Sequence, residues 1–470
     1  MALSKNPPAR LLLLLIVLAV PSLGVAQDRD VELAALRERV RLQEDQMRVM
    51  MEKIRALEER VTSPATAAPA QTAPVAAAST TAAVTRPPVV TASDRNFTLA
   101  SADRDNSLRI RAVIHFDSRT YFDDGGVGNN DAFLIRRARM TFEGALNRMF
   151  QYQIQPEFGG SSVGLNVANL TATFSPRFQV KFGRFKSTVG LEHQQGSSNA
   201  TLFAERSLVT SLIGGSDIGV QAMGESPGGL VRYAVGVFNG TPDGTVSTNT
   251  DTDDEKTVVG RIMLQPVDGL SVGVSGTFAP RQEGNAGLPS AYRTEGQQRF
   301  FAYAAGTMAD GELWRLSPQG HYYRGPFGSM AEYAISSTEI RSAGGVPATV
   351  DHKAWQLSLS YVLTGEDATY GGVTPAKRFD PVAGTWGAFQ VAARVSQLDV
   401  DDVVFPIFAA PGTNASKVDS FGLGLNWFMT NSVTLMVNYL QSSFDTEIAP
   451  TATLLKTGEK ALITRLQVVF

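Results

Sequence analysis

Basic side chains recur at alternate positions of apolar segments, a spacing that points to contact with anions. In SLRIRAVIHF (107–116), arginine alternates with leucine and isoleucine, and RRARMTFE (136–143) follows a similar pattern. Successive side chains of an extended chain point to opposite faces, so each segment has one apolar and one polar face. The basic residues predicted on the polar faces are Arg109, Arg111, Arg137, Arg139, Lys181, Arg232, Arg261, Arg315, Arg394 and Arg465.

Acidic residues are fewer on the same polar faces. They are Asp117, Glu143, Glu157, Asp217 and Glu332, although the whole chain has a formal net charge of −3. In a narrow passage of low dielectric constant, arginine side chains favour anions. Two interpretations stay open. Either the basic excess attracts anions, or each arginine pairs with a carboxylate on the same wall and only stiffens the fold.

Other kinds of chemistry have little support in the sequence. There is no cysteine, which excludes disulfides and thiolate catalysis, and the four histidines have no metal-ligand spacing. No motif groups a serine or an aspartate with a histidine, so we predict neither an enzyme nor a metal or cofactor site. The slightly negative net charge also argues against nucleic-acid binding.

The alternation continues through sixteen segments, which predict an all-β fold. Short links follow the second, fourth, sixth, eighth, tenth and fourteenth segments, whereas most links after odd-numbered segments are long. Short turns at one rim and long loops at the other are typical of outer-membrane barrels, so we predict a 16-stranded antiparallel transmembrane β-barrel. The segments are 107–117, 131–144, 150–158, 165–174, 178–185, 216–223, 229–238, 257–265, 270–279, 312–323, 327–338, 353–364, 385–398, 417–429, 432–444 and 459–469.

Three stretches test this scheme. The link 365–384 is long where a short turn is expected. The apolar stretch 298–307 resembles a further strand, but single-chain bacterial barrels have an even number of strands, so we assign it to a loop. The last ten residues, ALITRLQVVF, predict the closing strand, with Arg465 facing the lumen and Phe470 placed in an interfacial aromatic belt.

The amino-terminal residues predict export and self-association. Residues 1–26 have the basic start, short apolar run and small final residues of a signal peptide. Residues 27–61 contain a seven-residue apolar repeat that predicts a coiled-coil oligomerisation helix. Residues 62–94 are rich in alanine, proline and threonine and predict a linker, which leaves residues 95–470 for the barrel.

The longest early loop, 186–215, has a composition that favours folding into the barrel. Its apolar residues, which a solvated loop would not need, include Leu202, Phe203 and Leu208. Burial of these side chains in the lumen would place Glu205 and Arg206 at a constriction. The alternative is a surface loop that packs on itself.

From residue 107 on, the chain resembles the phosphate-selective porins O and P. The resemblance implies a trimeric 16-stranded channel whose third loop folds into the pore, with 365–384 as a family insertion at a turn. Only Lys186 and Arg206 are basic in 186–215, so phosphate specificity does not follow from it. The matching stretches are FLIRRARMTFEG (133–144), FGRFKSTVGLEHQQGSSNATLFAERSLV (182–209), GVFNG (236–240), LSPQGHYYRGPFGSMAEY (316–333), YVLTGE (361–366) and GLGLNWF (422–428).

These observations predict an outer-membrane porin for passive diffusion of small hydrophilic solutes, biased to phosphate or similar anions. The expected pore lining consists of the first nine basic residues named above and Arg206. The expected partners are outer-membrane lipid, lipopolysaccharide, small anions and further copies of the chain in a homotrimer, with the coiled coil in the periplasm. The alternative is a structural barrel that tethers the outer membrane to the cell wall or a periplasmic partner through its coiled coil.

Overall fold

The structure is a computed structural model. It describes residues 87–470 except 94–95, 123–129, 197–199, 248–250, 252–253, 285–287 and 452–453, together with residues 41, 48 and 52. The predicted signal peptide, nearly all of the predicted coiled coil, and the linker up to residue 86 therefore lie outside the described residues. None of the described helices is both long and apolar enough to cross a membrane.

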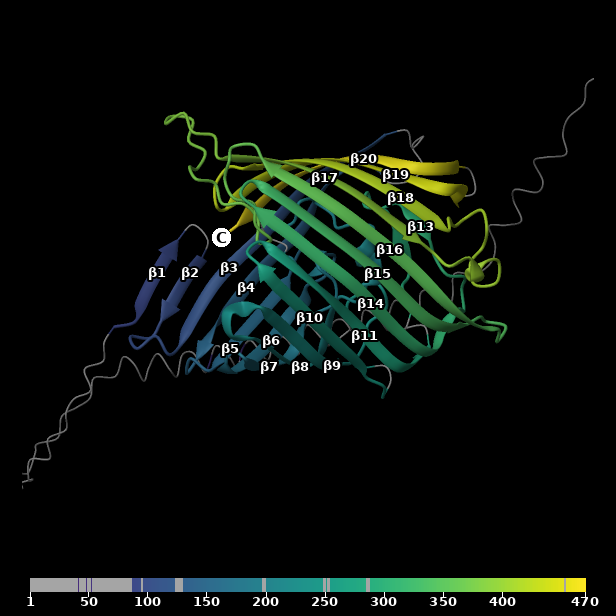
Figure 1. The fold of residues 1–470 in the computed structure, drawn as a ribbon, viewed down its shortest axis with the longest axis horizontal. Coiled ribbons are helices and arrows are strands. Elements are labelled where there is room, and N and C mark those ends of the chain that lie inside the picture. Colours follow the sequence, from purple (N-terminus) through teal and green to yellow (C-terminus); the bar gives the residue numbers. More distant parts are fainter. Residues whose placement is uncertain are drawn as a thin grey trace, which may run out of the picture. The chain divides into compact units, whose positions relative to one another are not determined.

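Sixteen antiparallel strands form a closed barrel, as predicted, and cross it obliquely (Figure 1). Each strand pairs with the next, and the last strand pairs with the first through the register Arg465↔Asp117. The backbone N–H of Phe470 completes the closure by donating to Ala112 O at 3.1 Å. The strands are β3 (Ser107–Phe122), β4 (Ala132–Leu146), β5 (Phe150–Glu157), β6 (Gly164–Ser175), β7 (Phe178–Lys186), β8 (Ser216–Glu225), β9 (Val231–Phe238), β10 (Thr257–Val267), β11 (Leu270–Gly284), β14 (Met308–Arg324), β15 (Phe327–Arg341), β16 (Pro347–Val362), β17 (Ala388–Asp399), β18 (Lys417–Phe428), β19 (Val433–Thr451) and β20 (Leu454–Val469).

The outer face of the barrel is apolar and the inner face is polar. Along β16, Trp355, Leu357 and Leu359 are exposed, while the alternating Gln356 and Ser358 are buried inside. Similar exposed apolar residues occur on the outer side of most strands. A protein in water would hide such a band, whereas a membrane barrel presents it to lipid.

A β-bulge in β4 changes the face on which its side chains lie. His115 pairs with Arg137 and Phe116 pairs with Ile135, so Arg136 has no partner position on β3. An extra residue reverses the alternation. Phe133 and Ile135 therefore point outward before the bulge, and Arg136 joins Arg137 on the inner side. Strict alternation predicted Arg137 on the inner wall but gave no place there to Arg136.

The connections follow the predicted difference between the two rims. The link 363–387 is the long exception at the short-turn rim. In the long link after β11, β12 (Tyr292–Arg293) and β13 (Arg299–Phe301) pair only with each other. Part of the stretch 298–307 thus forms a small hairpin within a loop, and its assignment outside the barrel wall is confirmed.

A second hairpin precedes the barrel. β1 (Val89–Ser93) pairs with β2 (Asn96–Ala100), and β2 continues the sheet beside the start of β3, with Phe97 opposite Ile110. The last residues of the predicted linker therefore form a strand. The β-branched run VVT favours a strand once a neighbouring edge is available, and β2 provides that edge.

Three loops from the long-loop rim pack inside the barrel, which confirms the predicted infolding of the third loop. We call 187–215 the third loop, 285–307 the fifth loop and 400–416 the seventh loop. The third loop contains the short 3-10 helices η1 (Glu192–Gln194) and η2 (Leu208–Leu212), and the seventh contains η5 (Asp402–Val404). Side chains of the three loops share one apolar core, which includes Leu208, Leu212, Phe300, Phe301 and Phe408.

Candidate functional site

Successive backbone amides fix the first part of the third loop. Gly190 N donates to Ser275 Oγ at 3.1 Å, and the next two amides, of Leu191 and Glu192, donate to the carboxylate of Glu332. Gly190 adopts a φ of +77°, and a Cβ at this position would lie 3.0 Å from the Glu332 carboxylate. Glycine suits both the backbone conformation and the close approach.

A buried carboxylate fixes the middle of the third loop. Glu205 accepts hydrogen bonds from Arg119 of β3 at 2.6 Å and from Arg136 of β4 at 2.7 Å, and Arg465 of β20 lies 3.5 Å away. Burial raises the pKa of Glu205, but Arg136, Arg465 and Arg119 outweigh it and hold that pKa well below its usual range. The ionised Glu205 thus ties the loop to the seam where the barrel closes.

Apolar contacts hold the same segment against the wall. Phe203 packs with Ala392, Leu440 and Ile463 of the inner face, and the backbone N–H of Ala204 donates to Asn438 Oδ1 at 2.8 Å. The third loop therefore lies against the wall that runs from β15 to β20. On the other side of the loop, side chains of β3, β4, β6 and β7 line a cavity.

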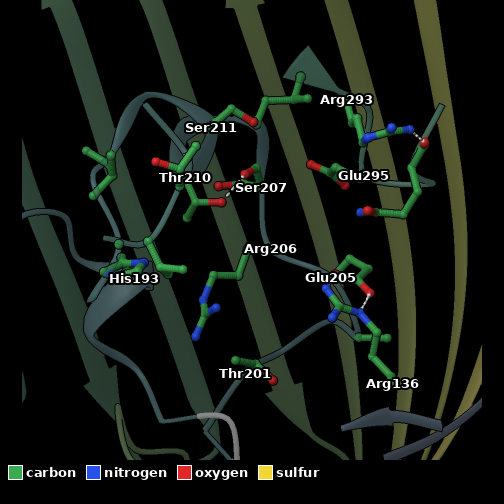
Figure 2. A pocket seen from close by; sticks show the side chains of 18 of the residues that line it. Arg136, His193, Thr201, Glu205, Arg206, Ser207, Thr210, Ser211, Arg293 and Glu295 are labelled. Atoms are coloured by element: carbon green, nitrogen blue, oxygen red, sulfur yellow. Dashed lines mark hydrogen bonds and ion pairs between the residues drawn. The ribbon is translucent and has the colours of Figure 1, made fainter. Parts of the chain in front are cut away.

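A cavity of about 480 Å³ opens at this point towards the long-loop rim. It brings together the predicted residues Arg137, Arg139 and Arg206, and it adds Lys186 and the bulge residue Arg136. In Figure 2, Arg206 lies between His193 on one side and the Arg136–Glu205 pair on the other. Basic side chains from two strands and from the third loop thus meet in one cavity.

Basic residues outnumber acidic ones around this cavity. Seven of the described lining residues are arginine or lysine, and three are acidic. Each of the three carboxylates, Glu205, Asp243 and Glu295, is already in an ion pair with at least one arginine. The lining therefore carries an uncompensated positive charge.

Four cations of the described lining have no ion pair with a carboxylate: Arg137, Lys186, Arg206 and the exposed Arg293, which donates to Gln297 O at 3.0 Å. Arg206 donates to the carbonyl oxygens of Glu192 and Gln195 at 3.3 and 3.2 Å, and Lys186 donates to those of His193 and Gln195 at 2.8 and 2.9 Å. A carbonyl group orients a cation without cancelling its charge. Among the described residues, Arg137 has neither a hydrogen bond nor an ion pair.

This environment shifts the pKa values of two side chains of the third loop. Burial, with Lys186, Arg206 and Arg137 nearby, lowers the pKa of His193 well below its usual value. Burial also lowers the pKa of Arg206, although Glu192 and Glu205 act in the opposite direction. His193 is therefore neutral at physiological pH, and the charge of the cavity does not depend on it.

The other predicted basic residues fall into two groups. The first group lines cavities nearer the short-turn rim. Arg109 and Lys181 share a cavity of about 480 Å³ with Glu143, which also pairs with Arg111 at 2.7 Å. Arg232 and Arg261 line a cavity of about 460 Å³ further round the barrel, and side chains of β7 contribute to both cavities.

The second group is buried in ion pairs. Arg315 pairs with Asp243 at 2.7 Å, and Arg394 pairs with Glu192 at 3.1 Å and with Glu295. Both arginines face inward but lie beneath the infolded loops, 3% and 1% exposed. These two side chains are paired, as the second interpretation expected, but their carboxylates come from loops and not from the same wall.

Comparison with known proteins gives the family. A model of the family "Phosphate-selective porin O and P" matches residues 108–470. The chain belongs to this family. Porin O of Pseudomonas aeruginosa is 24% identical over 395 residues, which cover 76% of this chain and 87% of that protein. The fold is similar to that of the outer membrane channel DcaP of Acinetobacter baumannii, with a TM-score of 0.52 and 11% identity over 79% of this chain and 99% of that one.

The family makes this chain a porin of the outer membrane, and therefore a channel rather than an enzyme. Short turns of such barrels face the periplasm and long loops face the exterior. The cavity around Arg206 is thus the external approach to the constriction, and the cavities around Arg109 and Arg261 are periplasmic. Among the described residues, no group of three or more histidines and carboxylates is suited to hold a metal ion.

Sequence reasoning missed Arg119, and it missed Arg136 for a specific reason. The apolar residues of β4 change parity between Ile135 and Ala138, which requires an extra residue in the strand. This change of parity was a signal for the bulge. No sequence pattern marked Arg119, because its role depends on a loop that returns from 86 residues further along the chain.

Cysteine accessibility tests the inner wall of β4. Cysteines introduced at positions 136, 137 and 139 of the porin are expected to react with a charged, membrane-impermeant thiol reagent, because all three positions line the aqueous cavity. Cysteines at 138 and 140 are expected to be at least about tenfold slower, because lipid covers them. The measurement is the labelling rate in intact outer membranes. Fast labelling at 138 together with slow labelling at 137 would contradict the register.

Proposed function

We propose that this porin passes small hydrophilic solutes with a bias to anions. The observation that carries the proposal is the cluster of Arg137, Lys186 and Arg206, whose charges no carboxylate of the described lining compensates. A fixed positive charge beside a narrow passage lowers the free energy of an anion there and raises that of a cation.

We propose that phosphate is one of several small anions that pass, rather than a tightly held ligand. The family's description supports phosphate as a solute. Tight binding needs several free donors, and Arg136, Arg139 and Arg465 are already in ion pairs with Glu205, Glu157 and Asp117. Phosphate is therefore expected to block chloride current only weakly.

The test is the reversal potential of the purified porin in a planar bilayer under a potassium chloride gradient. The expected sign is that of an anion-selective channel. The selectivity is expected to fade at molar salt, where the screening length falls to about 3 Å. A reversal potential of cation sign would refute the proposal.

We further propose that residues 27–61 join copies of the porin into a homotrimer on the periplasmic side. Deletion of residues 27–86 removes no described strand, so the barrel is expected to fold and insert normally. Cross-linking and the heat-dependent gel mobility of the truncated protein provide the measurement. A truncated porin that fails to insert would contradict the independence of the barrel from this segment.

A further inference from the structure

Part of the periplasmic link 363–387 enters the barrel at the short-turn rim and contacts the third loop. Ala368 and Val373 are buried in a cluster with Val362 and Phe428 of the wall. The hydroxyl of Tyr370 donates to Leu191 O at 2.6 Å, and Gln195 Nε2 donates to Tyr370 O at 3.2 Å. Residues 368–373 of the link therefore form a floor under the third loop, whereas much of the rest of the link, including Val382 and Trp386, is exposed.

A cavity of about 460 Å³ lies beside this floor, lined by residues of β8 to β11, β14, the third loop and Tyr370. The ring of Tyr370 stacks on His321, with centroids 4.7 Å apart and an interplanar angle of 11°. Arg261 and Tyr370 both line this cavity, and the two side chains interact electrostatically. These three side chains form one side of the cavity, held in place from two directions by the floor and the wall.

Two polar atoms at this position have no partner in the protein. Arg261 Nε and a ring nitrogen of His321, Nδ1, are buried without a hydrogen-bond partner among the described residues. Buried polar groups are nearly always paired with protein, water or a ligand. Arg261 Nε is enclosed, but the Arg261 side chain lines the open cavity, and the rest of its guanidinium can donate to an anion there.

The balance of charge in the cavity suits a single negative group. Its described lining contains two arginines and one carboxylate, that of Glu225. Arg232 lies 3.5 Å from Glu225 at the exposed rim, whereas Arg261 has no ion pair among the described residues. One positive charge thus remains deep in the cavity, beside the Tyr370 ring.

The rest of the lining combines apolar side chains with uncharged polar ones, among them four glutamines. Leu191, Met223, Met263 and Leu264 contribute to it, and thioether sulfur makes favourable contacts with aromatic rings. The external cavity, by contrast, is lined mainly by charged and hydroxyl-bearing side chains. A small hydrated anion would gain nothing from the apolar side chains, whereas a flat apolar body would.

We propose that this cavity is a periplasmic-side binding site for aromatic monocarboxylates. The carboxylate accepts hydrogen bonds from Arg261, and the aromatic body packs between the Tyr370 ring edge and the methionines. The proposal deepens the proposed function and rests on it, because it requires anions to enter the barrel. Such a site would bind solutes with an aromatic body in preference to small inorganic anions. The external cavity does not distinguish these two classes of anion.

Block of chloride current by benzoate tests the site in the full-length porin. Benzoate added at the periplasmic face is expected to halve the current at a concentration at least about tenfold lower than acetate does. Arg261→Gln is expected to raise the half-blocking concentration of benzoate about tenfold or more, which corresponds to about 1.4 kcal/mol. The matched control is Arg324→Gln, which removes the same charge at the exposed end of β14, outside the cavity.

Calorimetry of the detergent-solubilised porin with benzoate separates the two proposals. Benzoate binding that Arg261→Gln abolishes, in a protein that conducts no chloride, would overturn the channel function and leave the site standing. Normal chloride current with equal effects of benzoate and acetate would overturn the site. Equal losses of benzoate block in Arg261→Gln and Arg324→Gln would also overturn the site. They would show that the block depends only on the net charge at the periplasmic mouth.

Discussion

The Glu205→Ala variant is expected to conduct at least about twice the single-channel current of the wild type, with frequent steps between levels. The physical reason is that Glu205 is the only described carboxylate that joins the third loop to Arg136, and Arg119 and Arg465 share it. Breaking a buried ion pair on one side costs about 3–5 kcal/mol, because the remaining charge is left unpaired. Arg119 and Arg465 would keep Asp117, but Arg136 would lose its ion pair beside them, and the loop segment would move into the passage and out again.

Glu143→Ala is the matched control, since Glu143 pairs with Arg109 and Arg111 on the wall and does not contact the third loop. It is expected to leave the current levels steady. Unchanged conductance in Glu205→Ala, with a normally folded barrel on gels, would show that the apolar contacts of Phe203 alone hold the loop.

The pH dependence of the same contact follows from the depressed pKa of Glu205. A carboxylate whose pKa is lower in the folded state than in the unfolded state stabilises the fold at pH values above its unfolded-state pKa of about 4.3. This stabilisation is lost as the pH falls through the folded-state pKa. The Glu205 contact is therefore expected to persist from pH 8 to about pH 5, without the unsteady current that its loss would cause. Glu205→Gln is expected to show at pH 7 the unsteady current that the wild type shows only in strong acid.

The double variant Arg137→Gln, Arg206→Gln is expected to lose most of the anion preference of the porin. At an effective dielectric constant of about 40, a unit charge about 6 Å from the ion contributes about 1.4 kcal/mol, a tenfold preference. Both side chains lack a carboxylate partner among the described residues, so their removal leaves no buried carboxylate unpaired. The permeability ratio of chloride to potassium is expected to fall about tenfold or more.

Arg177→Gln is the control for this variant, because it removes one positive charge from an exposed periplasmic turn. Its reversal potential is expected to match that of the wild type at 0.1 M salt, where charges more than about 10 Å from the passage are screened. Arg139→Gln is expected to have a smaller effect than Arg137→Gln, since Glu157 already compensates Arg139. Equal shifts in all these variants would show that net charge, and not the unpaired cations, sets the selectivity.

The sequence by itself determined the barrel and the orientation of its side chains. Two-residue alternation is a local property, and lipid outside the wall requires it on every strand. Leu357 and Gln356 therefore point outward and inward as their order in the chain predicts. The apolar Phe203 and Leu208 also indicated that the third loop is buried, because their exposure would be costly.

Only the tertiary structure decided which inward charges face the passage. Arg137 and Arg394 are equivalent in the sequence pattern, yet the first is unpaired and the second is buried between Glu192 and Glu295. Glu192 and Glu295 come from loops, and no period relates a loop to the wall that it contacts. The contact of Tyr370 with the third loop could not be predicted from the sequence for the same reason. Charge compensation acts over a few ångströms in space, and the residues that provide it here lie 99 to 202 positions away from Arg394 in the chain.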